Sequence, residues 1–356
     1  MEYPSIRLYY PGGKAGSFGT LAEGYLRAFR ELGIKHAAFD YREPPDEDGF
    51  GVGGSNYDIG LYLGEPTHLN LMHIHTSHKE RLVMVAPNGL GIPDVIGQSC
   101  KAFGVKPLSP SEWGARIVAK ATGMPVEVAP HGVHVQLNGP PQLRPRDPGD
   151  KLRLLHFTST SSDRKGTLTL LEAMKRQGVA EAADLVIHCD PLIEDDLLDI
   201  VSDLPIQVSR HIDVQSWPIE NDGSYGDYLL SFDAVVQPSR AEGFGLVPLE
   251  AASVGRPAIL TPGTGHDMYT RDIYQIPLVY PVDLWGTVFD EEGYGMIDGE
   301  PYPVMGICEQ EVADAILYVH RRYDHMSEWA LAKSASVREK WSWTNVVKKW
   351  LEGRQA

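Results

Sequence analysis

Two glutamates, Glu242 and Glu250, are separated by seven residues in the segment AEGFGLVPLE, which covers residues 241–250. Gly243 and Gly245 follow the first glutamate directly and precede an apolar stretch that predicts a helix. A glycine-flanked loop that runs into a helix N-terminus exposes unpaired backbone N–H groups, and the helix dipole adds positive potential there. The segment therefore predicts a diphosphate site, and Glu250, about two turns into the helix, is placed to accept hydrogen bonds from a ribose diol.

A second loop, residues 157–166 with the sequence FTSTSSDRKG, also lies between a predicted strand and a predicted helix. It places Arg164 and Lys165 directly before the helix begins. These residues are either ordinary surface charges or ligands of an anion. Because a helix N-terminus normally disfavours cations, their position favours an anionic partner.

Strands alternate with helices along the chain, which indicates parallel sheets of the α/β class. In the first half, residues 5–10 predict a buried strand, Pro11 to Gly19 a glycine-rich loop, and residues 20–32 a helix. The second half repeats the pattern, with strands over 152–157, 185–188 and 234–237 and a helix over 167–177.

The length of 356 residues favours two domains, because single cores stop growing near about 250–300 residues. A Pro- and Gly-rich stretch within 137–150 has the composition of a linker. We therefore predict two Rossmann-like domains over 1–145 and 146–335 that face each other across a central cleft, with a helix over 336–356 that packs back on the first domain. Four tryptophans are expected to pack these C-terminal helices onto a neighbouring domain: Trp329, Trp341, Trp343 and Trp350. Residues 271–306 predict a long irregular excursion.

Composition limits the partners and the location. The formal charge of −16 disfavours nucleic acid and anionic lipid over the whole surface. No apolar run approaches the about 20 residues that span a bilayer, and the N-terminus lacks the pattern of a signal peptide, so we expect a cytoplasmic protein. Three widely spaced cysteines, Cys100, Cys189 and Cys308, predict buried, reduced thiols instead of disulfides or a zinc site.

The segment EGFG, with Glu250 eight positions after Glu242, resembles the E-x7-E signature of the retaining nucleotide-sugar glycosyltransferases of family GT4, which have the GT-B fold. The resemblance is strengthened by the strand that precedes the segment and by Gly255-Arg256-Pro257 after it. It extends over most of the chain. It implies that Glu242 lies beside the donor sugar and that Glu250 binds the nucleotide ribose.

The same resemblance assigns the remaining donor-binding residues. Lys165 matches the lysine that neutralises the donor diphosphate, and a fixed cation there stabilises the departing phosphate in the transition state. The family's arginine lies five residues earlier, where this chain has Thr160, so its role passes to Arg164 or is absent. Glu242 and Lys165 are the predicted catalytic residues. The residues predicted to bind the donor are Gly16, Gly19, Arg164, Lys165, Gly243, Phe244, Gly245, Leu246 and Glu250.

Histidines give no metal prediction. His73, His75 and His78 have an HxHxxH spacing without an acidic cluster, and enzymes of this fold generally need no catalytic metal, so we expect satisfied or surface histidines, with acceptor contact as the alternative. The family often has a histidine near the donor sugar where this chain has Asn88. Either Asn88 or His75 is a candidate for that place. Pro130 to Val133 is expected to be structural.

The sequence thus predicts a metal-independent, retaining glycosyltransferase that moves a sugar from a nucleoside diphosphate to an acceptor hydroxyl. No cofactor is expected. Favoured acceptors are a saccharide, a small molecule or a protein, and a modified DNA base is retained as an alternative. A sugar-nucleotide epimerase of the same fold and a non-catalytic nucleotide-sugar-binding protein are the alternative functions.

Overall fold

The computed structural model describes residues 3–11, 17–41, 57–64, 78–87, 92–147, 149–159, 164–216, 225–273, 275–277, 285–287, 296–297, 300–301, 303–305 and 307–354. The chain divides into two compact units, each with its own parallel sheet. The first unit comprises Met1–Pro87, Gly91–His134 and Lys340–Ala356, and the second is built from Val135–Glu339.

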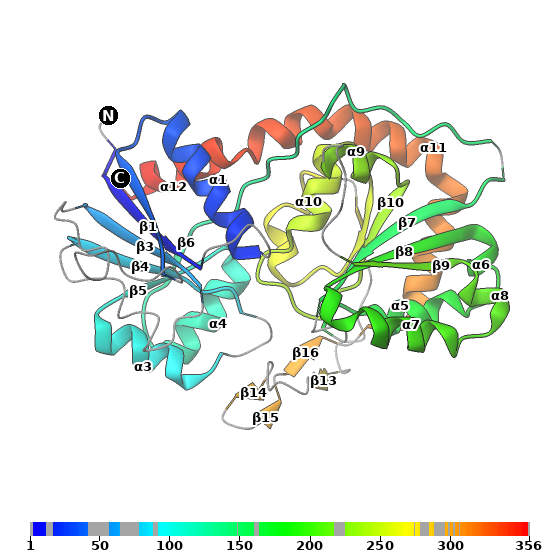
Figure 1. The fold of residues 1–356 in the computed structure, drawn as a ribbon, viewed down its shortest axis with the longest axis horizontal. Coiled ribbons are helices and arrows are strands. Elements are labelled where there is room, and N and C mark those ends of the chain that lie inside the picture. Colours follow the sequence, from blue (N-terminus) through cyan, green and yellow to red (C-terminus); the bar gives the residue numbers. More distant parts are fainter. Residues whose placement is uncertain are drawn as a thin grey trace. The chain divides into compact units, whose positions relative to one another are not determined.

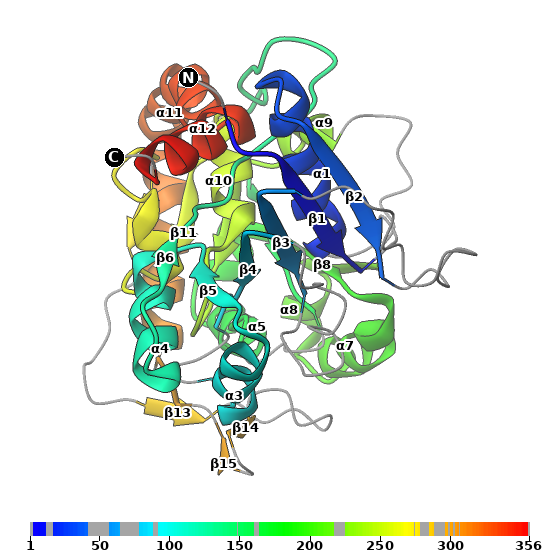
Figure 2. The ribbon, with the colours of Figure 1, turned by 90° about the vertical axis from the view of Figure 1, so that its left-hand side faces the viewer.

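The sheet of the first unit has six parallel strands in the order β2-β1-β3-β4-β5-β6 (Figure 2). The strands are β1 (Ile6–Tyr10), β2 (His36–Asp40), β3 (Ile59–Leu63), β4 (Glu80–Met84), β5 (Lys106–Ser109) and β6 (Glu127–Val128). Every residue of β3 is buried, as expected for a central strand of a parallel sheet that is covered on both faces. Strand β2 lies on one side of β1, and strands β3 to β6 are added in turn on the other side. The strand order therefore reverses between β1 and β3.

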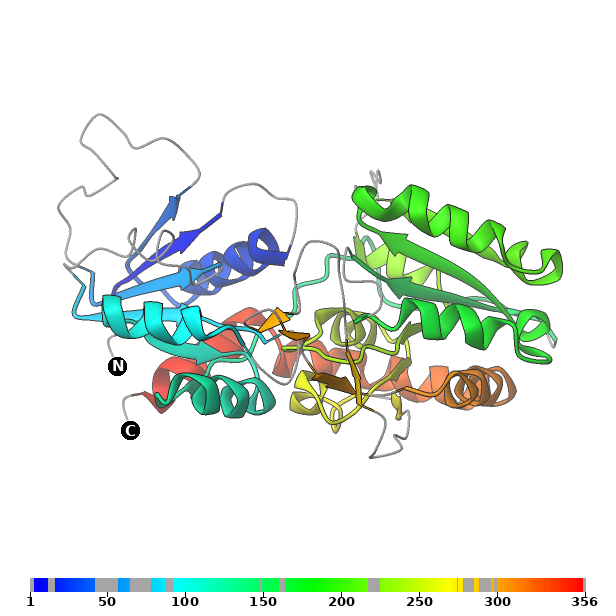
Figure 3. The same cartoon turned by 90° about the horizontal axis from the view of Figure 1, so that it is seen from below.

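Helices cover both faces of this sheet. Helices α3 (Asp94–Phe103) and α4 (Glu112–Thr122) lie side by side on one face, shown in cyan and teal in Figure 3. Helix α1 (Ser17–Glu31) lies on the opposite face and packs against α12 (Trp343–Gly353). Gly104 and Gly123 end α3 and α4 in the left-handed conformation, which glycine adopts without steric cost.

Tryptophans attach α12 to the first unit. Trp343 is 3% exposed, and its indole packs so closely on α1 that a Cβ at Gly24 would lie 2.1 Å from it. Trp350 Nε1 donates to Glu127 Oε1 at 2.5 Å. Trp341 is also buried, and its carbonyl accepts from Val133 N at 2.7 Å. The packing role predicted for four tryptophans is confirmed for Trp341, Trp343 and Trp350, whereas Trp329 is only half-buried. The structural role predicted for the segment ending at Val133 is also confirmed.

The sheet of the second unit also has six parallel strands, in the order β12-β11-β10-β7-β8-β9. Figure 1 labels β10, β7, β8 and β9 of this sheet. The strands are β7 (Leu152–Phe157), β8 (Ala183–Cys189), β9 (Ile212–Ser216), β10 (Ala234–Gln237), β11 (Ala258–Leu260) and β12 (Gln275–Pro277). The order reverses between the neighbours β7 and β10. In open α/β sheets, ligands bind beyond the carboxyl ends of the strands at such a reversal.

Helices α5 (Thr167–Met174), α7 (Glu194–Ser202) and α11 (Glu309–Lys340) share one hydrophobic core against this sheet. Helices α9 (Tyr225–Leu230) and α10 (Leu246–Ser253) cover the opposite face (Figure 1). The short helices are α6 (Val179–Ala182), α8 (Ile206–Ser209), η1 (Pro191–Ile193) and η2 (Gly265–Met268). Helix α11 begins at Glu309, well before the C-terminal helix expected over 336–356, because apolar residues continue at helical spacing from Val312 onward.

The predicted excursion over 271–306 contains two small antiparallel ribbons within the described residues. One pairs β13 (Trp285–Thr287) with β16 (Pro303–Met305), and the other pairs β14 (Met296–Ile297) with β15 (Glu300–Pro301). All three cysteines are free, as predicted, but Cys308 is only half-buried. None of the helices in the described ranges is apolar over a length sufficient to cross a bilayer.

Candidate active site

The two loops singled out from the sequence meet at the carboxyl edge of the second sheet. Strand β10 leads into residues 238–245, and the neighbouring strand β7 leads into residues 158–166. Each loop ends in a glycine of left-handed conformation that begins a helix: Gly245 (φ 76°) begins α10 and Gly166 (φ 75°) begins α5. Two helix N-termini therefore lie at the point where the strand order reverses, which is a favourable place for an anion.

Both glycines are required by close contacts. A Cβ at Gly166 would lie 2.0 Å from Pro238 O, and a Cβ at Gly245 would lie 2.2 Å from His266 Nε2. Since real Cβ atoms do not approach other atoms this closely, any side chain at either position would displace the loops.

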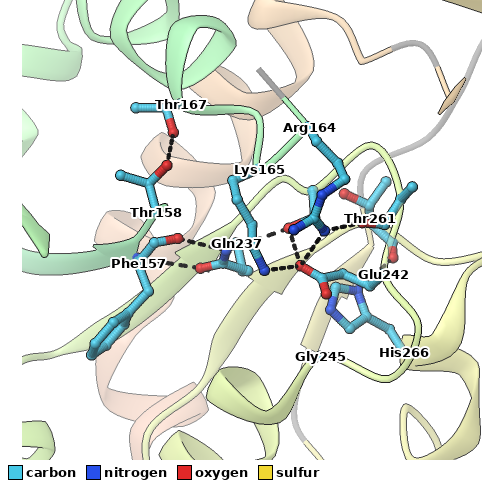
Figure 4. Close-up of polar contacts among 12 residues, drawn as sticks. Phe157, Thr158, Arg164, Lys165, Thr167, Gln237, Glu242, Gly245, Thr261 and His266 are labelled. Atoms are coloured by element: carbon cyan, nitrogen blue, oxygen red, sulfur yellow. Dashed lines mark hydrogen bonds and ion pairs between the residues drawn. The ribbon is translucent and has the colours of Figure 1, made fainter. Parts of the chain in front are cut away.

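Three charged side chains gather between these helix starts (Figure 4). Lys165 Nζ lies 2.6 Å from Glu242 Oε1, which also accepts from Ser239 Oγ at 2.9 Å. Arg164 Nη1 donates to Ala241 O at 2.9 Å and lies 3.8 Å from the same carboxylate oxygen. The structure thus brings together Glu242, Lys165 and Arg164, which were predicted as site residues from two separate loops.

The charges in this cluster hold one another ionised. Burial raises the pKa of Glu242, but the charges of Lys165 and Arg164 outweigh it and bring that pKa down to about 2. Burial lowers the pKa of Lys165, and the Glu242 carboxylate opposes that change. Two cations and one anion leave a net charge of +1 at this edge, in a chain whose formal net charge is −16. The local field therefore attracts phosphate although the chain as a whole repels it.

His266, which follows β11, was not selected from the sequence. Its ring is fully buried against Gly245, its Nδ1 donates to Thr261 O at 2.9 Å, and its Nε2 has no hydrogen-bond partner among the described residues. Burial lowers its pKa, so the imidazole is neutral. Residues next to His266 bond to the backbone of the loop over 238–245. Gly265 N donates to Glu242 O at 2.8 Å, and the Tyr269 hydroxyl donates to Gly245 O. The segment after β11 therefore fixes the backbone of the loop at Glu242.

A buried polar layer joins β7 and β10 beneath the cluster. Gln237 Nε2 donates to Phe157 O at 2.9 Å, and its Oε1 accepts from Phe157 N at 3.3 Å. His156 Nδ1 donates to Val236 O at 2.8 Å, while its Nε2 lies 2.9 Å from Thr167 Oγ1 at the start of α5. These contacts connect the two strand ends to the two helix starts. No sequence motif predicts these contacts, because a single histidine or glutamine in a strand has no characteristic spacing from other residues.

Glu250 lies on α10, and within the described part of the chain its side chain bonds to that of Tyr225. The Tyr225 hydroxyl donates to Glu250 Oε2 at 2.9 Å. Burial raises the pKa of Glu250 to about 7, and the hydrogen bond from Tyr225 opposes that rise. The carboxyl group is therefore divided between its protonated and ionised forms near neutral pH.

This raised pKa predicts a pH-dependent stability. Between about pH 4.5, the ordinary pKa of the group, and about pH 7, the folded protein retains a proton on Glu250 that the unfolded chain has lost. The contribution of Glu250 to the free energy of unfolding should therefore decrease as pH rises through this window and stay constant above it. Denaturant unfolding of the wild type and of Glu250→Gln across pH 4.5–8 measures it. The difference between the two curves should slope across this window, and parallel curves would contradict the raised pKa.

The other predicted residues contribute less to the described site. Phe244 is 3% exposed, and its ring packs edge-on against Tyr269 with centroids 5.4 Å apart. Gly19 lies within α1 of the first unit. Gly16, Asn88 and Thr160 lie outside the described residues, as do His73 and His75.

His78 is a satisfied histidine, as expected. Its Nδ1 donates to Tyr57 O at 3.3 Å, so its Nε2 accepts from the Tyr9 hydroxyl at 2.7 Å. Within the described ranges, no group of three or more His, Cys, Asp or Glu side chains is arranged to hold a metal ion.

Solved structures share this architecture over nearly the whole chain. HepE of Anabaena in complex with UDP and glucose is 13% identical with a TM-score of 0.64, and the match covers 99% of this chain and 100% of that one. Sucrose-phosphate synthase of Thermosynechococcus elongatus is 14% identical with a TM-score of 0.66, covering 99% and 98%. The lipopolysaccharide outer core galactosyltransferase WaaB is 12% identical with a TM-score of 0.58, covering 98% and 99%. No curated protein sequence matches the chain.

The fold is therefore GT-B, as predicted. The match to a family of glycosyltransferases shows that the chain is a glycosyltransferase. Residues 95–350 match the family described as Family 4 Glycosyltransferase in conflict systems, and the chain belongs to that family. The matched range includes both loops of the candidate site and the helices that follow them.

Proposed function

We propose that this glycosyltransferase takes its sugar from a nucleoside-diphosphate sugar and transfers it to an acceptor hydroxyl with retention of anomeric configuration and without a metal. The observation that carries the proposal is the Lys165–Glu242 pair, which lies with Arg164 between two helix N-termini where the strand order reverses. HepE, which has the same fold, was crystallised with UDP and with UDP-glucose, and this supports a nucleotide-sugar donor.

In this proposal Lys165 and Arg164 hold the donor diphosphate together with the backbone of residues 243–246. Glu250 binds the ribose, and Glu242 lies beside the sugar. The bond between the anomeric carbon and the phosphate oxygen breaks, and its electron pair stays on the phosphate. The acceptor oxygen bonds to the same face of the carbon and gives its proton to the departing phosphate, so no side chain is assigned as general base.

Lys165 supplies positive charge where the reaction develops negative charge. The cation is already fixed by Glu242 before the donor arrives, so little reorganisation is needed during the reaction. A pair of fixed cations performs the charge neutralisation for which other enzymes use a divalent metal, and this is the physical basis for proposing a metal-independent reaction. The acidic surface favours a saccharide, a small molecule or a protein as the acceptor over a polyanion.

A donor that binds only the folded protein should raise its thermal stability. At a free concentration 100 times its dissociation constant, a ligand adds about 2.7 kcal/mol. Because 1 kcal/mol corresponds to about 2–4 °C for domains of 150–250 residues, the expected rise is about 5–11 °C. Thermal unfolding with UDP-, GDP-, ADP- and CMP-sugars, in buffer containing a metal chelator, tests the donor class and the metal requirement together. If none of the four sugars raises the melting temperature with or without Mg²⁺, the donor proposal is wrong.

A second measurement separates transfer from the alternative reactions on this fold. The donor that stabilises the protein is incubated alone and then with candidate acceptors, and the products are followed by mass spectrometry and by NMR of the anomeric proton. A glycosylated acceptor with the anomeric configuration of the donor supports the proposal. Isomerisation of the donor without any acceptor would instead identify an epimerase.

A further inference from the structure

Tyr225 connects the two parts of the candidate donor site. Its hydroxyl donates to Glu250 Oε2 at 2.9 Å, and its ring packs edge-on against Phe157, with centroids 6.3 Å apart. Phe157 is the last residue of β7, directly before the loop that carries Lys165. One side chain therefore contacts both the helix of Glu250 and the strand end that leads to the cationic loop.

The backbone at Tyr225 is held by its neighbour. Gly226 N donates to Gln136 O at 3.2 Å, and a Cβ at Gly226 would lie 2.2 Å from the same oxygen. No other residue fits at position 226 without moving the start of α9. The close contact therefore fixes the point from which the Tyr225 side chain extends to Glu250.

The chemistry of this contact is specific. Burial next to Glu250 raises the pKa of Tyr225 well above 10, so the phenol keeps its proton and acts as a donor. A carboxylate has about four lone-pair positions, and one phenol leaves enough of them for two ribose hydroxyls. A glutamate side chain loses conformational entropy when it is held in one rotamer. The hydrogen bond from Tyr225 holds Glu250 before the ligand binds, so less of this entropy is lost on binding.

We propose that Tyr225 is a positioning residue that orients the Glu250 carboxylate toward the ribose diol of the nucleotide donor. This inference rests on the proposed function. Tyr225 acts through Glu250 and contributes to the recognition of ribose, not of the phosphates. It also favours the ionised form of Glu250, the form that accepts both hydroxyl protons. Tyr269 is a second titratable group near Glu250 in the described part of the chain, and the Glu250 charge helps to raise the pKa of its phenol.

The test compares two tyrosines of the same helix. Tyr225→Phe removes the hydrogen bond to Glu250. Tyr228→Phe is the matched control, because the Tyr228 hydroxyl donates to Gln215 Oε1 at 3.2 Å instead. Isothermal titration calorimetry measures the binding of UDP, GDP and ADP and of the 2′,3′-dideoxy form of each. The ratio of the two dissociation constants for a given base reports ribose recognition alone.

For the nucleotide that binds the wild type, Tyr225→Phe should weaken the ribose form about tenfold, in line with the loss of one hydrogen bond to a charged group, and leave the dideoxy form within about twofold. Tyr228→Phe should leave the ratio unchanged. The wild-type affinity for the ribose form should rise as pH increases through about 7, because Glu250 ionises there. In Tyr225→Phe this midpoint should move to higher pH, since the lost bond favoured the carboxylate.

The possible failures are distinguishable. If Tyr225→Phe weakens both forms equally, or leaves the ratio and the pH midpoint unchanged while the wild type still prefers ribose, the positioning role is wrong and the proposed function stands. If the wild type binds none of the three nucleotides, both proposals are overturned. Glu250→Gln should remove the ribose preference and the pH dependence together, and retention of either would assign them to another group.

Discussion

Lys165→Ala should lower kcat for sugar transfer by about 10³-fold, which corresponds to about 4 kcal/mol of transition-state stabilisation. The reason is the position of its ammonium group, 2.6 Å from Glu242 between the starts of α5 and α10, where in the proposed reaction the departing diphosphate gains charge. KM for the donor should change much less than kcat, since the interaction strengthens as the phosphate leaves. Steady-state kinetics with the donor identified by thermal unfolding measures both constants.

Stability provides the necessary control for this variant. Removing the lysine leaves the buried Glu242 carboxylate with Arg164 at 3.8 Å as its nearest cation, and breaking a buried ion pair costs about 3–5 kcal/mol. The double variant Lys165→Ala/Glu242→Gln should recover most of this stability but not the activity. Lys175 lies just beyond the end of α5 and pairs with Glu172 on the surface. Lys175→Ala should therefore change neither the stability nor the activity. Recovery of transfer in the double variant would show that the cation is not needed for the reaction.

The sequence was sufficient to assign Lys165 and the motif at Glu242 to one site, although it did not predict their ion pair. Both residues follow predicted strands and precede predicted helices, and the carboxyl ends of parallel strands share one edge of a sheet. The chain order does not reveal that β7 and β10 are neighbours, because 76 residues separate Phe157 from Ala234 and the sheet is extended on both sides of this pair. Only the fold shows that the strand order reverses there.

The residues that the sequence did not reveal act through close contacts. Tyr225 is one of 16 tyrosines, and its proposed role depends on a hydroxyl that reaches Glu250, 25 positions away. His266 acts by packing its ring against Gly245, a contact without any sequence period. Helical or strand periodicity predicts which residues share a face of one element, but not which atoms of two elements touch. The same limit applies to Phe244, since the motif does not indicate that its ring packs against Tyr269.

Gly245→Ala should disable the site by a different route, through the backbone. The residue has φ 76° and ψ 82°, which costs a residue with a side chain about 1–3 kcal/mol, and its new Cβ would lie 2.2 Å from His266 Nε2. The neutral, fully buried imidazole is held by Thr261 O and cannot move without losing that bond. The loop must therefore shift, which moves Glu242 and the start of α10 away from Lys165. We expect a loss of about 3 kcal/mol in the free energy of unfolding and of at least about 10²-fold in donor affinity.

Removing the obstruction separates steric clash from backbone strain. In Gly245→Ala/His266→Ala the new methyl group has space, so the donor affinity should recover by about tenfold, while the cost of the positive φ remains. His266→Ala alone leaves a cavity beneath the loop and should cost about 1–3 kcal/mol of stability with a smaller loss of affinity. Calorimetric donor binding and denaturant unfolding of the three variants measure these effects. If the double variant is as impaired as the sum of the two single variants, His266 does not hold the loop at Gly245. Recovery would instead show that one buried imidazole sets the conformation of the loop on which Glu242 meets Lys165.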